Sequence, residues 1–204
     1  VSPQFIRRLE LRFYFRYTTD LSLQESFVPS MSAKPAPADH QSFVDDQPDI
    51  RLYPSFDDMP LNTMLLRGIY SYGFEKPSAI QQRSIVPMIK GGDIIAQAQS
   101  GTGKTGAFSI ALLQRIDFLN HNLQALILSP SRESAQQTHE FVSKIGELLS
   151  GSTAFCHTFV GKTHIKEDVK KLKLGVTVAV GTPGRVSDVI RRGALRTDSL
   201  RVLV

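Results

Sequence analysis

Short apolar runs alternate with amphipathic stretches along residues 54–204. The apolar runs predict strands, and they lie at 93–98, 125–128, 154–160, 176–180 and 201–204. The stretches between them predict helices, because apolar residues recur every three or four positions, at 104–119, 132–149, 165–173 and 185–192. Strands that alternate with helices form βαβ units. The pattern therefore predicts an α/β domain with a mainly parallel sheet flanked by helices, and ligands at the carboxyl ends of its strands.

The first 53 residues follow a different pattern. From Met31 onward they are small, polar and proline-bearing, which is typical of a disordered N-terminal segment. Residues 9–17 alternate as a strand would, but no neighbouring pattern offers them a pairing partner. We predict that residues 1–53 are disordered, and we hypothesise that Met31 is the true start and residues 1–30 a translated leader. A mitochondrial presequence is the alternative, weakened by the acidic residues among its arginines.

Composition narrows the class of protein. Apolar residues make up 41% and charged residues 21% of the chain, as in ordinary globular proteins. No apolar run approaches the roughly 20 residues that span a bilayer, so no membrane association is expected. The single cysteine, Cys156, allows no intramolecular disulfide, which favours a cytosolic or nuclear location, and of these we predict the cytoplasm. Residues 54–204 hold 18 Lys and Arg against 12 Asp and Glu, a net of +6, which suits a phosphate-bearing partner.

A glycine-rich loop follows the strand predicted at 93–98. Its residues are Ala98, Gln99, Ser100, Gly101, Thr102, Gly103, Lys104 and Thr105. This is the phosphate-loop pattern, in which glycines let successive N–H groups cradle phosphate oxygens at the start of a helix. Lys104 would supply a charge to the β- and γ-phosphates, and the Thr105 hydroxyl would be a ligand of Mg²⁺. A chance match would have no reason to lie between a strand and a helix, so we predict binding of ATP and Mg²⁺.

A second candidate for nucleotide recognition lies upstream, at residues 73–81. Pro77 is expected to open a helix that carries Gln81, whose amide could bond the N6 and N7 atoms of adenine. Phe56 could stack on the base. Without the phosphate loop, the same residues would be a helix-start proline and a surface glutamine.

Five motifs together resemble the DEAD-box RNA helicases. GFEKPSAIQ at 73–81 resembles their Q motif, and AQSGTGKT at 98–105 resembles their motif I. PSRESA at 130–135 is similar to motif Ia, Gly161 with Lys162 falls where the family has a Gly-Gly pair, and TPGR at 182–185 matches motif Ib. Order and spacing agree along residues 54–204, and several stretches look most like the initiation factor 4A group.

The resemblance implies a RecA-like phosphate-loop NTPase domain, with a Q motif region at 54–82 and a partial helicase ATP-binding domain at 54–204. It implies an ATP-dependent RNA helicase that unwinds RNA in translation initiation, with other initiation factors as partners. Gln81 and Phe56 would read adenine. One RNA strand would be held by its backbone at Pro130, Arg132, Gly161, Thr182, Pro183, Gly184 and Arg185. Such contacts carry no base identity, so binding should tolerate any sequence and weaken with salt.

Three residues depart from the family pattern, all on the RNA side. Ser131 stands for Thr, Ser134 for Leu and Lys162 for the second Gly. A buried Ser134 would forfeit on the order of 2 kcal/mol of apolar burial. We hypothesise that nucleotide binding is intact and RNA binding altered. Restoring Ser134→Leu and Lys162→Gly should then change the affinity for RNA and leave that for ATP alone.

Residues 201–204 look like the strand that leads into the family's acidic tetrad. We therefore expect the sheet to be incomplete at its C-terminal end, and these 204 residues alone to lack ATP hydrolysis and RNA unwinding. The alternative is a non-catalytic half-helicase that binds ATP, RNA or a translation factor. A phosphate-loop enzyme of another kind, such as a kinase, fits the Q motif and TPGR poorly. A Cys156–His157 catalytic dyad is not expected, because neighbouring strand residues face opposite ways.

Overall fold

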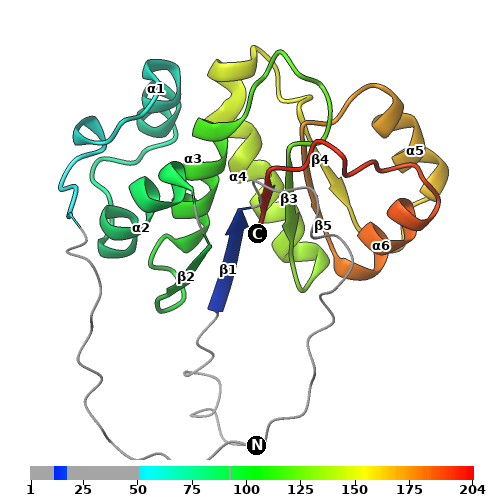
Figure 1. The fold of residues 1–204 in the computed structure, drawn as a ribbon, viewed down its shortest axis with the longest axis horizontal. Helices are drawn as coiled ribbons and strands as arrows, with labels where there is room; N and C mark the ends of the chain where they lie inside the picture. The colour runs from blue at the N-terminus through cyan, green and yellow to red at the C-terminus, as the bar shows by residue number, and fades with distance from the viewer. Residues whose placement is uncertain (1–11, 18–50, 92) are drawn as a thin grey trace, which may run out of the picture.

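The computed structural model describes residues 12–17, 51–91 and 93–204. Within this part of the chain a sheet of six strands runs in the order β2-β1-β6-β3-β5-β4 (Figure 1). The strands are β1 (Arg12–Tyr17), β2 (Ile94–Gln97), β3 (Ala125–Leu128), β4 (Cys156–Phe159), β5 (Val178–Gly181) and β6 (Val202–Leu203). The expected α/β class is confirmed.

Strands β3 to β6 form the parallel part of the sheet. Strand β3 pairs in parallel with both β5 and β6, so that Leu126 lies opposite Ala179 on one side and Leu203 on the other. Strand β4 continues the parallel pairing on the far side of β5. All four residues of β5 are buried, as expected for a strand covered on both faces. The carboxyl ends of these strands therefore meet at one edge of the sheet.

Strand β1 is antiparallel to both of its neighbours. It pairs with β2, where Arg12 lies opposite Gln97, and with β6, where Tyr17 lies opposite Val202. The expectation that this segment has no pairing partner is wrong. Its partners lie far along the chain, and ladder hydrogen bonds join main-chain groups that leave no local mark in the sequence. Apart from β1 and residues 51–53, the predicted disorder of residues 1–53 and the leader hypothesis concern residues that lie outside the described part.

The ordered domain begins slightly before the expected boundary. Tyr53 is buried in the main core, its N–H donates to the carbonyl of Gln82, and Arg51 lies over its ring. A short 3₁₀ helix, Phe56–Asp58, follows it. The segment before residue 54 is therefore packed from Arg51 onward.

Among the residues that the structure describes, six α-helices cover the two faces of the sheet. They are α1 (Thr63–Ser71), α2 (Ala79–Lys90), α3 (Lys104–Arg115), α4 (Arg132–Ser150), α5 (Ile165–Lys173) and α6 (Pro183–Arg191). Ala125 and Ile127 of β3 pack with α1 to α4, whereas Leu126 between them packs in a second core with α5 and α6. Figure 1 shows α1 to α3 gathered on one side and α5 and α6 on the other.

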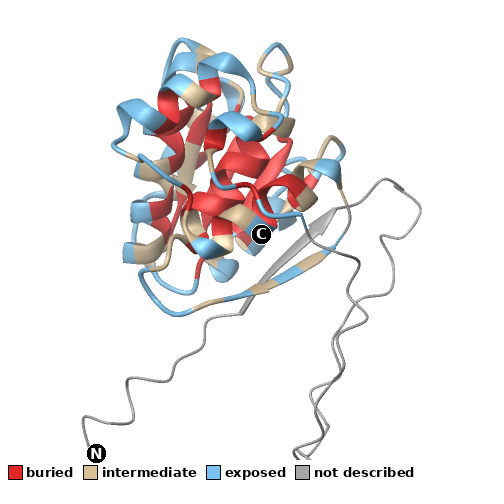
Figure 2. Cartoon of the chain, turned by 90° about the vertical axis from the view of Figure 1, so that its left-hand side faces the viewer, coloured by how far each residue is buried: buried red, intermediate tan, exposed pale blue. Residues whose placement is uncertain are grey.

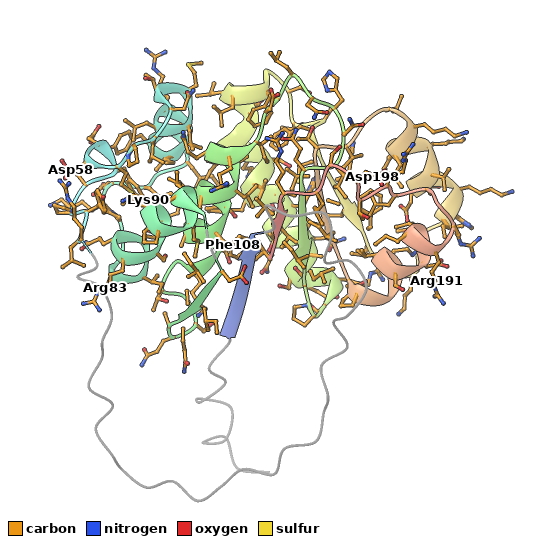
Figure 3. The ribbon with its side chains drawn as sticks, viewed as in Figure 1. Asp58, Arg83, Lys90, Phe108, Arg191 and Asp198 are labelled. Atoms are coloured by element: carbon orange, nitrogen blue, oxygen red, sulfur yellow. The ribbon has the colours of Figure 1, made fainter. Side chains whose placement is uncertain are left out.

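Buried residues concentrate between these layers, as Figure 2 shows. In Figure 3, Phe108 of α3 lies in the interior, whereas Arg83 of α2 and Arg191 of α6 project outward on opposite sides of the molecule. None of the helices in the described ranges is long and apolar enough to cross a membrane.

Candidate functional site

The glycine-rich loop lies between β2 and the start of α3. Gly101 and Gly103 have φ angles of 80° and 92°, in the left-handed region that glycine adopts without strain. Gly103 caps α3, and Lys104 is the first residue of that helix. The free N–H groups of the first helical turn and the positive end of its dipole are therefore presented at the loop, where they suit an anion.

Lys104 folds back into its own loop. Its buried ammonium group donates to the main-chain carbonyls of Ala98 and of Gln99, the latter at 2.6 Å. Burial lowers the pKa of Lys104 from its ordinary value. The charge thus lies inside the curl of the loop, at the position where the phosphate-loop pattern predicts it. Phosphate oxygens are stronger acceptors for an ammonium group than neutral carbonyls.

Gln81 connects the start of α2 to the same loop. Its side chain is 1% exposed; its Oε1 accepts from the N–H of Ser78 at 2.9 Å, and its Nε2 donates to the carbonyl of Gly103 at 3.1 Å. A Cβ added at Gly103 would come within 2.7 Å of that Nε2. Gln81 therefore lies beside the phosphate loop as expected, but it bonds protein groups. Its role as an adenine reader stays a prediction.

Phe56 does not present a face to a ligand. Its ring is 0% exposed and packs edge-on against Tyr70 and Phe74, with centroid distances of 6.3 and 6.1 Å. The predicted stacking on adenine is incompatible with this position, because the apolar cluster around the ring already covers it. Phe74 is the ring nearer the loop helix, since its Cζ lies 3.4 Å from a Cβ placed on Gly106 of α3. Sequence reasoning missed Phe74, although it follows Gly73 in the quoted motif.

Thr105 follows Lys104 and is half-buried in the first turn of α3. Nowhere in the described ranges do three His, Cys, Asp or Glu residues gather where they could hold a metal ion. A hydroxyl beside the phosphate cradle suits Mg²⁺, which takes few protein ligands and completes its shell with phosphates and water. Thr105 therefore stays a predicted ligand. Val204, directly after β6, lines the same small cavity as Lys104 and Ala107.

Two of the departures from the family pattern lie at the start of α4. Ser131 caps the helix, since its hydroxyl accepts from the N–H of Ser134 at 3.1 Å. Ser134 is half-buried, so the apolar burial that a leucine would gain there is only partial. Pro130 is exposed, and the Nε of Arg132 is buried without a hydrogen-bond partner among the described residues. Arg132 therefore keeps donor capacity beside the helix start.

The third departure, Lys162, adopts a conformation that glycine favours. Its φ is 68°, and it is the one non-glycine residue with positive φ in the ranges that the structure describes. An L-residue pays about 1–2 kcal/mol for this region. The pKa of Glu133 lies below its ordinary value, chiefly because its carboxylate accepts hydrogen bonds from its own main chain and from Ser131. The positive charges of Arg132 and then of Lys162 lower the same pKa further. The loop after β4 therefore lies near the start of α4.

The TPGR turn forms the start of α6. Thr182 precedes the helix, Pro183 occupies its first position, and a Cβ added at Gly184 would meet nothing within 4 Å. Arg185 bonds protein groups: its Nη1 donates to Oδ2 of Asp168 at 2.7 Å and its Nη2 to the carbonyl of Thr163 at 2.8 Å. The guanidinium is therefore engaged with a buried carboxylate, and its contact with an RNA phosphate stays a prediction.

Sequence reasoning also missed Asp168, the buried partner of Arg185. Its side chain is 3% exposed and lies on α5, three residues after Ile165 and four before Leu172, which both pack against the second core. An acidic residue within an apolar helix stripe was therefore the available signal. Helix spacing alone does not name its partner on another helix.

Cys156 and His157 are the neighbouring residues of β4 for which no catalytic pairing is expected. Burial raises the pKa of the Cys156 thiol to about 12. The imidazole of His157 is half-buried, and desolvation first, then the charges of Lys171 and His139, lower its pKa. A thiol with so high a pKa supplies almost no thiolate near neutral pH.

The glycine-rich loop that follows β2, the start of α3 and the buried lysine together define a phosphate-loop nucleotide-binding domain. The family model described as DEAD/DEAH box helicase matches residues 78–204. The chain therefore belongs to the DEAD/DEAH box helicase family, which confirms the resemblance drawn from its motifs.

Relatives and solved structures agree with this assignment. The "Probable eukaryotic initiation factor 4A" of Trypanosoma brucei brucei is 66% identical over 176 residues, which cover 86% of this chain and 44% of the relative. The "ATP-dependent RNA helicase eIF4A" of Neosartorya fischeri is 56% identical over 150 residues, 74% of this chain and 37% of the relative. The chain thus spans less than half the length of these relatives.

Solved structures show the same fold. A DEAD box protein from Methanococcus jannaschii aligns with a TM-score of 0.66 at 30% identity, over 73% of this chain and 40% of that chain. Dbp5 of S. cerevisiae, bound to RNA and ADP BeF3, aligns with a TM-score of 0.61 at 35% identity, over 72% of this chain and 37% of that chain.

Proposed function

We propose that residues 51–204 are the ATP-binding and RNA-binding part of an ATP-dependent RNA helicase of the initiation factor 4A group. The observation that carries this proposal is the buried Lys104 inside the glycine-rich loop at the start of α3. Likeness to the initiation factor 4A relatives supports a role in translation initiation, in the cytoplasm and with other initiation factors as partners.

On the nucleotide side, the loop from Ala98 to Thr105 would hold the phosphates of ATP. The N–H groups at the start of α3 would donate hydrogen bonds to the phosphate oxygens, and Lys104 would donate to those oxygens in place of the carbonyls of Ala98 and Gln99. Thr105 would contribute one oxygen ligand to Mg²⁺, which supplies positive charge against the phosphate groups when bound.

On the RNA side, three turns follow β3, β4 and β5 at the same edge of the sheet. The turns after β3 and β5 lead into helices α4 and α6, whose first N–H groups can donate to phosphate oxygens. A Cβ at Gly161 or Gly184 would meet no atom within 4 Å, so a strand of RNA can approach the main chain there. Contacts of this kind position a backbone and read no base.

Titration with a fluorescent ATP analogue tests the nucleotide side, since it measures binding and needs no turnover. Lys104→Gln should weaken binding about 10- to 100-fold, because it removes a charge-assisted contact to phosphate. Lys173→Gln, which changes an exposed lysine of α5, is the matched control and should bind as the wild type does. Equal affinities of Lys104→Gln and the wild type would overturn the proposed site.

Fluorescence anisotropy with single-stranded RNA tests the other side. The wild type should bind oligonucleotides of different sequence alike, and its affinity should fall as salt rises. Gly184→Ala adds only a methyl group in open space, so it should leave the melting temperature unchanged and still weaken RNA binding about threefold to tenfold by blocking one main-chain contact. A wild type that binds no RNA at low salt would remove this half of the proposal.

A further inference from the structure

A buried ion pair joins helices α5 and α6, which begin after the turns that follow β4 and β5. Arg185 on α6 and Asp168 on α5 lie 2.7 Å apart, with side chains 12% and 3% exposed. The second nitrogen of the same guanidinium donates to the carbonyl of Thr163, in the loop that precedes α5. One planar group therefore contacts a carboxylate and a main-chain carbonyl from two different segments.

This pair differs from the other ion pairs of the described chain. Lys144 with Glu140, Arg192 with Asp188 and Arg196 with Asp198 are all substantially exposed, where such pairs contribute little. Arg185 and Asp168 have given up most of their hydration, which is favourable only when geometry and partners are well matched. The burial of this pair therefore indicates that Arg185 and Asp168 hold each other in one fixed geometry, which an exposed ion pair does not need.

The surrounding hydrogen bonds hold the base of each loop but not the distance between the loops' tips. The Thr163 hydroxyl donates to the carbonyl of Val160 at 2.9 Å, and the N–H of Thr182 donates to the carbonyl of Phe159 at 3.1 Å. Gly161 and Lys162 lie between Val160 and Thr163, and Lys162 is the residue with the positive φ described above. The Arg185 fork is the contact that ties this stretch to the start of α6.

We propose that Asp168 is a positioning residue for RNA binding. By fixing Arg185, it holds the loop at 161–163 against the turn at 182–185, so that both loops present main-chain groups to one RNA strand at a set spacing. Asp168 itself contacts no RNA. This inference rests on the proposed RNA binding and names the residue pair that organises it.

The two possible roles of Arg185 predict opposite changes in RNA affinity when Asp168 loses its charge. Asp168→Asn removes a negative charge near a polyanion and loosens Arg185, so a direct phosphate role for Arg185 would give tighter RNA binding and a steeper salt dependence. Positioning by Asp168 gives the opposite: affinity falls about threefold to tenfold while the slope against salt is unchanged, because no phosphate contact by a charged group is lost.

The experiment uses the full chain, with anisotropy for RNA, the fluorescent analogue for ATP and thermal melting for the fold. Asp168→Asn should bind RNA more weakly and ATP normally. The matched control is Asp188→Asn, which disrupts the exposed Asp188–Arg192 pair on α6 and should change neither affinity. A folded Asp168→Asn chain that binds RNA as tightly as the wild type, or more tightly, overturns the inference.

A second variant keeps the test decisive if Asp168→Asn does not fold. Arg185→Lys retains a charge for Asp168, but a single ammonium on a shorter reach cannot reproduce the fork to the Thr163 carbonyl. It should fold, bind ATP normally and lose RNA affinity; normal RNA affinity would count against the proposal. A wild type that fails to bind RNA refutes the proposed function itself, whereas a wild type that binds with unaffected variants refutes only the positioning role.

Discussion

Lys104 follows β2 and Arg185 follows β5, and each is the basic residue of a motif. Lys104 is held by two carbonyls of its own loop, whereas Arg185 is held by a buried carboxylate on another helix and by a carbonyl of a second loop. The two carbonyls that accept from Lys104 are neutral and near it in the sequence, whereas Arg185 has a charged partner that is distant in the sequence.

This difference separates a cation that is available to bind a ligand, Lys104, from a cation that stabilises the fold, Arg185. Carbonyls of an exposed loop can return to water, so Lys104 can leave them for a phosphate at small cost. Asp168 cannot return to water without local unfolding, so Arg185 cannot leave it without stranding a buried charge. The two halves of the site therefore use similar residues for different ends.

The largest expected effect contrasts the two cations directly. Arg185→Met should lower the free energy of unfolding by about 3–5 kcal/mol, because it leaves Asp168 buried and unpaired. Lys104→Met should change that free energy by no more than about 1 kcal/mol. Urea denaturation of both variants measures the difference, and equal losses would abolish the distinction.

A double variant controls for lost packing in this comparison. Arg185→Met with Asp168→Leu replaces the pair by apolar side chains of similar size, which often restores or raises stability. Recovery of most of the loss assigns the effect of Arg185→Met to the stranded charge. No recovery would assign it to the lost contact with Thr163.

Two glycines sharpen the same contrast with a smaller effect. A Cβ at Gly181, the last residue of β5, would lie 2.5 Å from the main-chain carbonyl of Phe159, whereas one at Gly106 of α3 would lie 2.6 Å from the movable Nε2 of Gln81. Gly181→Ala should therefore destabilise the fold by about 1–3 kcal/mol, while Gly106→Ala costs less stability. Gly106→Ala should instead weaken binding of the ATP analogue, since Gln81 must move away from the phosphate loop.

These two effects are read by urea denaturation and by nucleotide titration on the same samples. Gly161→Ala serves as the control for both, because a Cβ there meets nothing within 4 Å. A larger loss of stability in Gly106→Ala than in Gly181→Ala would contradict the expectation that the Gln81 side chain can move aside more easily than the main chain of Phe159.

Replacing Lys162 tests whether the RNA side carries conformational strain. Lys162→Gly should raise the free energy of unfolding by about 0.5–1 kcal/mol, since relief of the positive φ outweighs the greater freedom of glycine in the unfolded chain. Lys162→Ala is the control that removes the ammonium group and keeps the strain. If both variants have the stability of the wild type, the strain is negligible.

The smallest expected effect is a dependence of stability on pH, which arises from His157 in β4. Burial lowers the pKa of His157 below its ordinary 6.5, so below that pH the unfolded chain binds the proton more readily than the folded one. The contribution of His157 to stability is therefore complete above pH 6.5 and is lost as pH falls through its folded pKa. Melting temperatures between pH 7 and pH 5 should fall less in His157→Gln than in the wild type.

The exposed His164 provides the control for that measurement. His164→Gln should follow the wild-type curve, because its side chain is exposed and the substitution removes no buried group. A flatter curve in His164→Gln than in His157→Gln would show that burial of His157 is not the source of the dependence.

Much of this architecture could be predicted from local pattern. The strands at 125–128 and 176–180 and the helices after them follow from apolar periodicity, and the phosphate loop follows from glycines at a fixed spacing before a lysine. Local signals of this kind work because main-chain conformation and the face of a helix depend on a few neighbouring residues. Phe56 escaped this reasoning, since whether an aromatic ring is covered depends on residues elsewhere in the chain.

The sequence by itself determined the fold class, the family and the place of the nucleotide loop. Only the tertiary structure decided that β1 lies between β2 and β6, that Gln81 bonds the carbonyl of Gly103, and that Arg185 belongs to Asp168. The physical reason is shared by all three. A motif specifies which groups a residue carries, but the partner that satisfies those groups is chosen by long-range packing, where burial makes one hydrogen-bonded arrangement more stable than the rest.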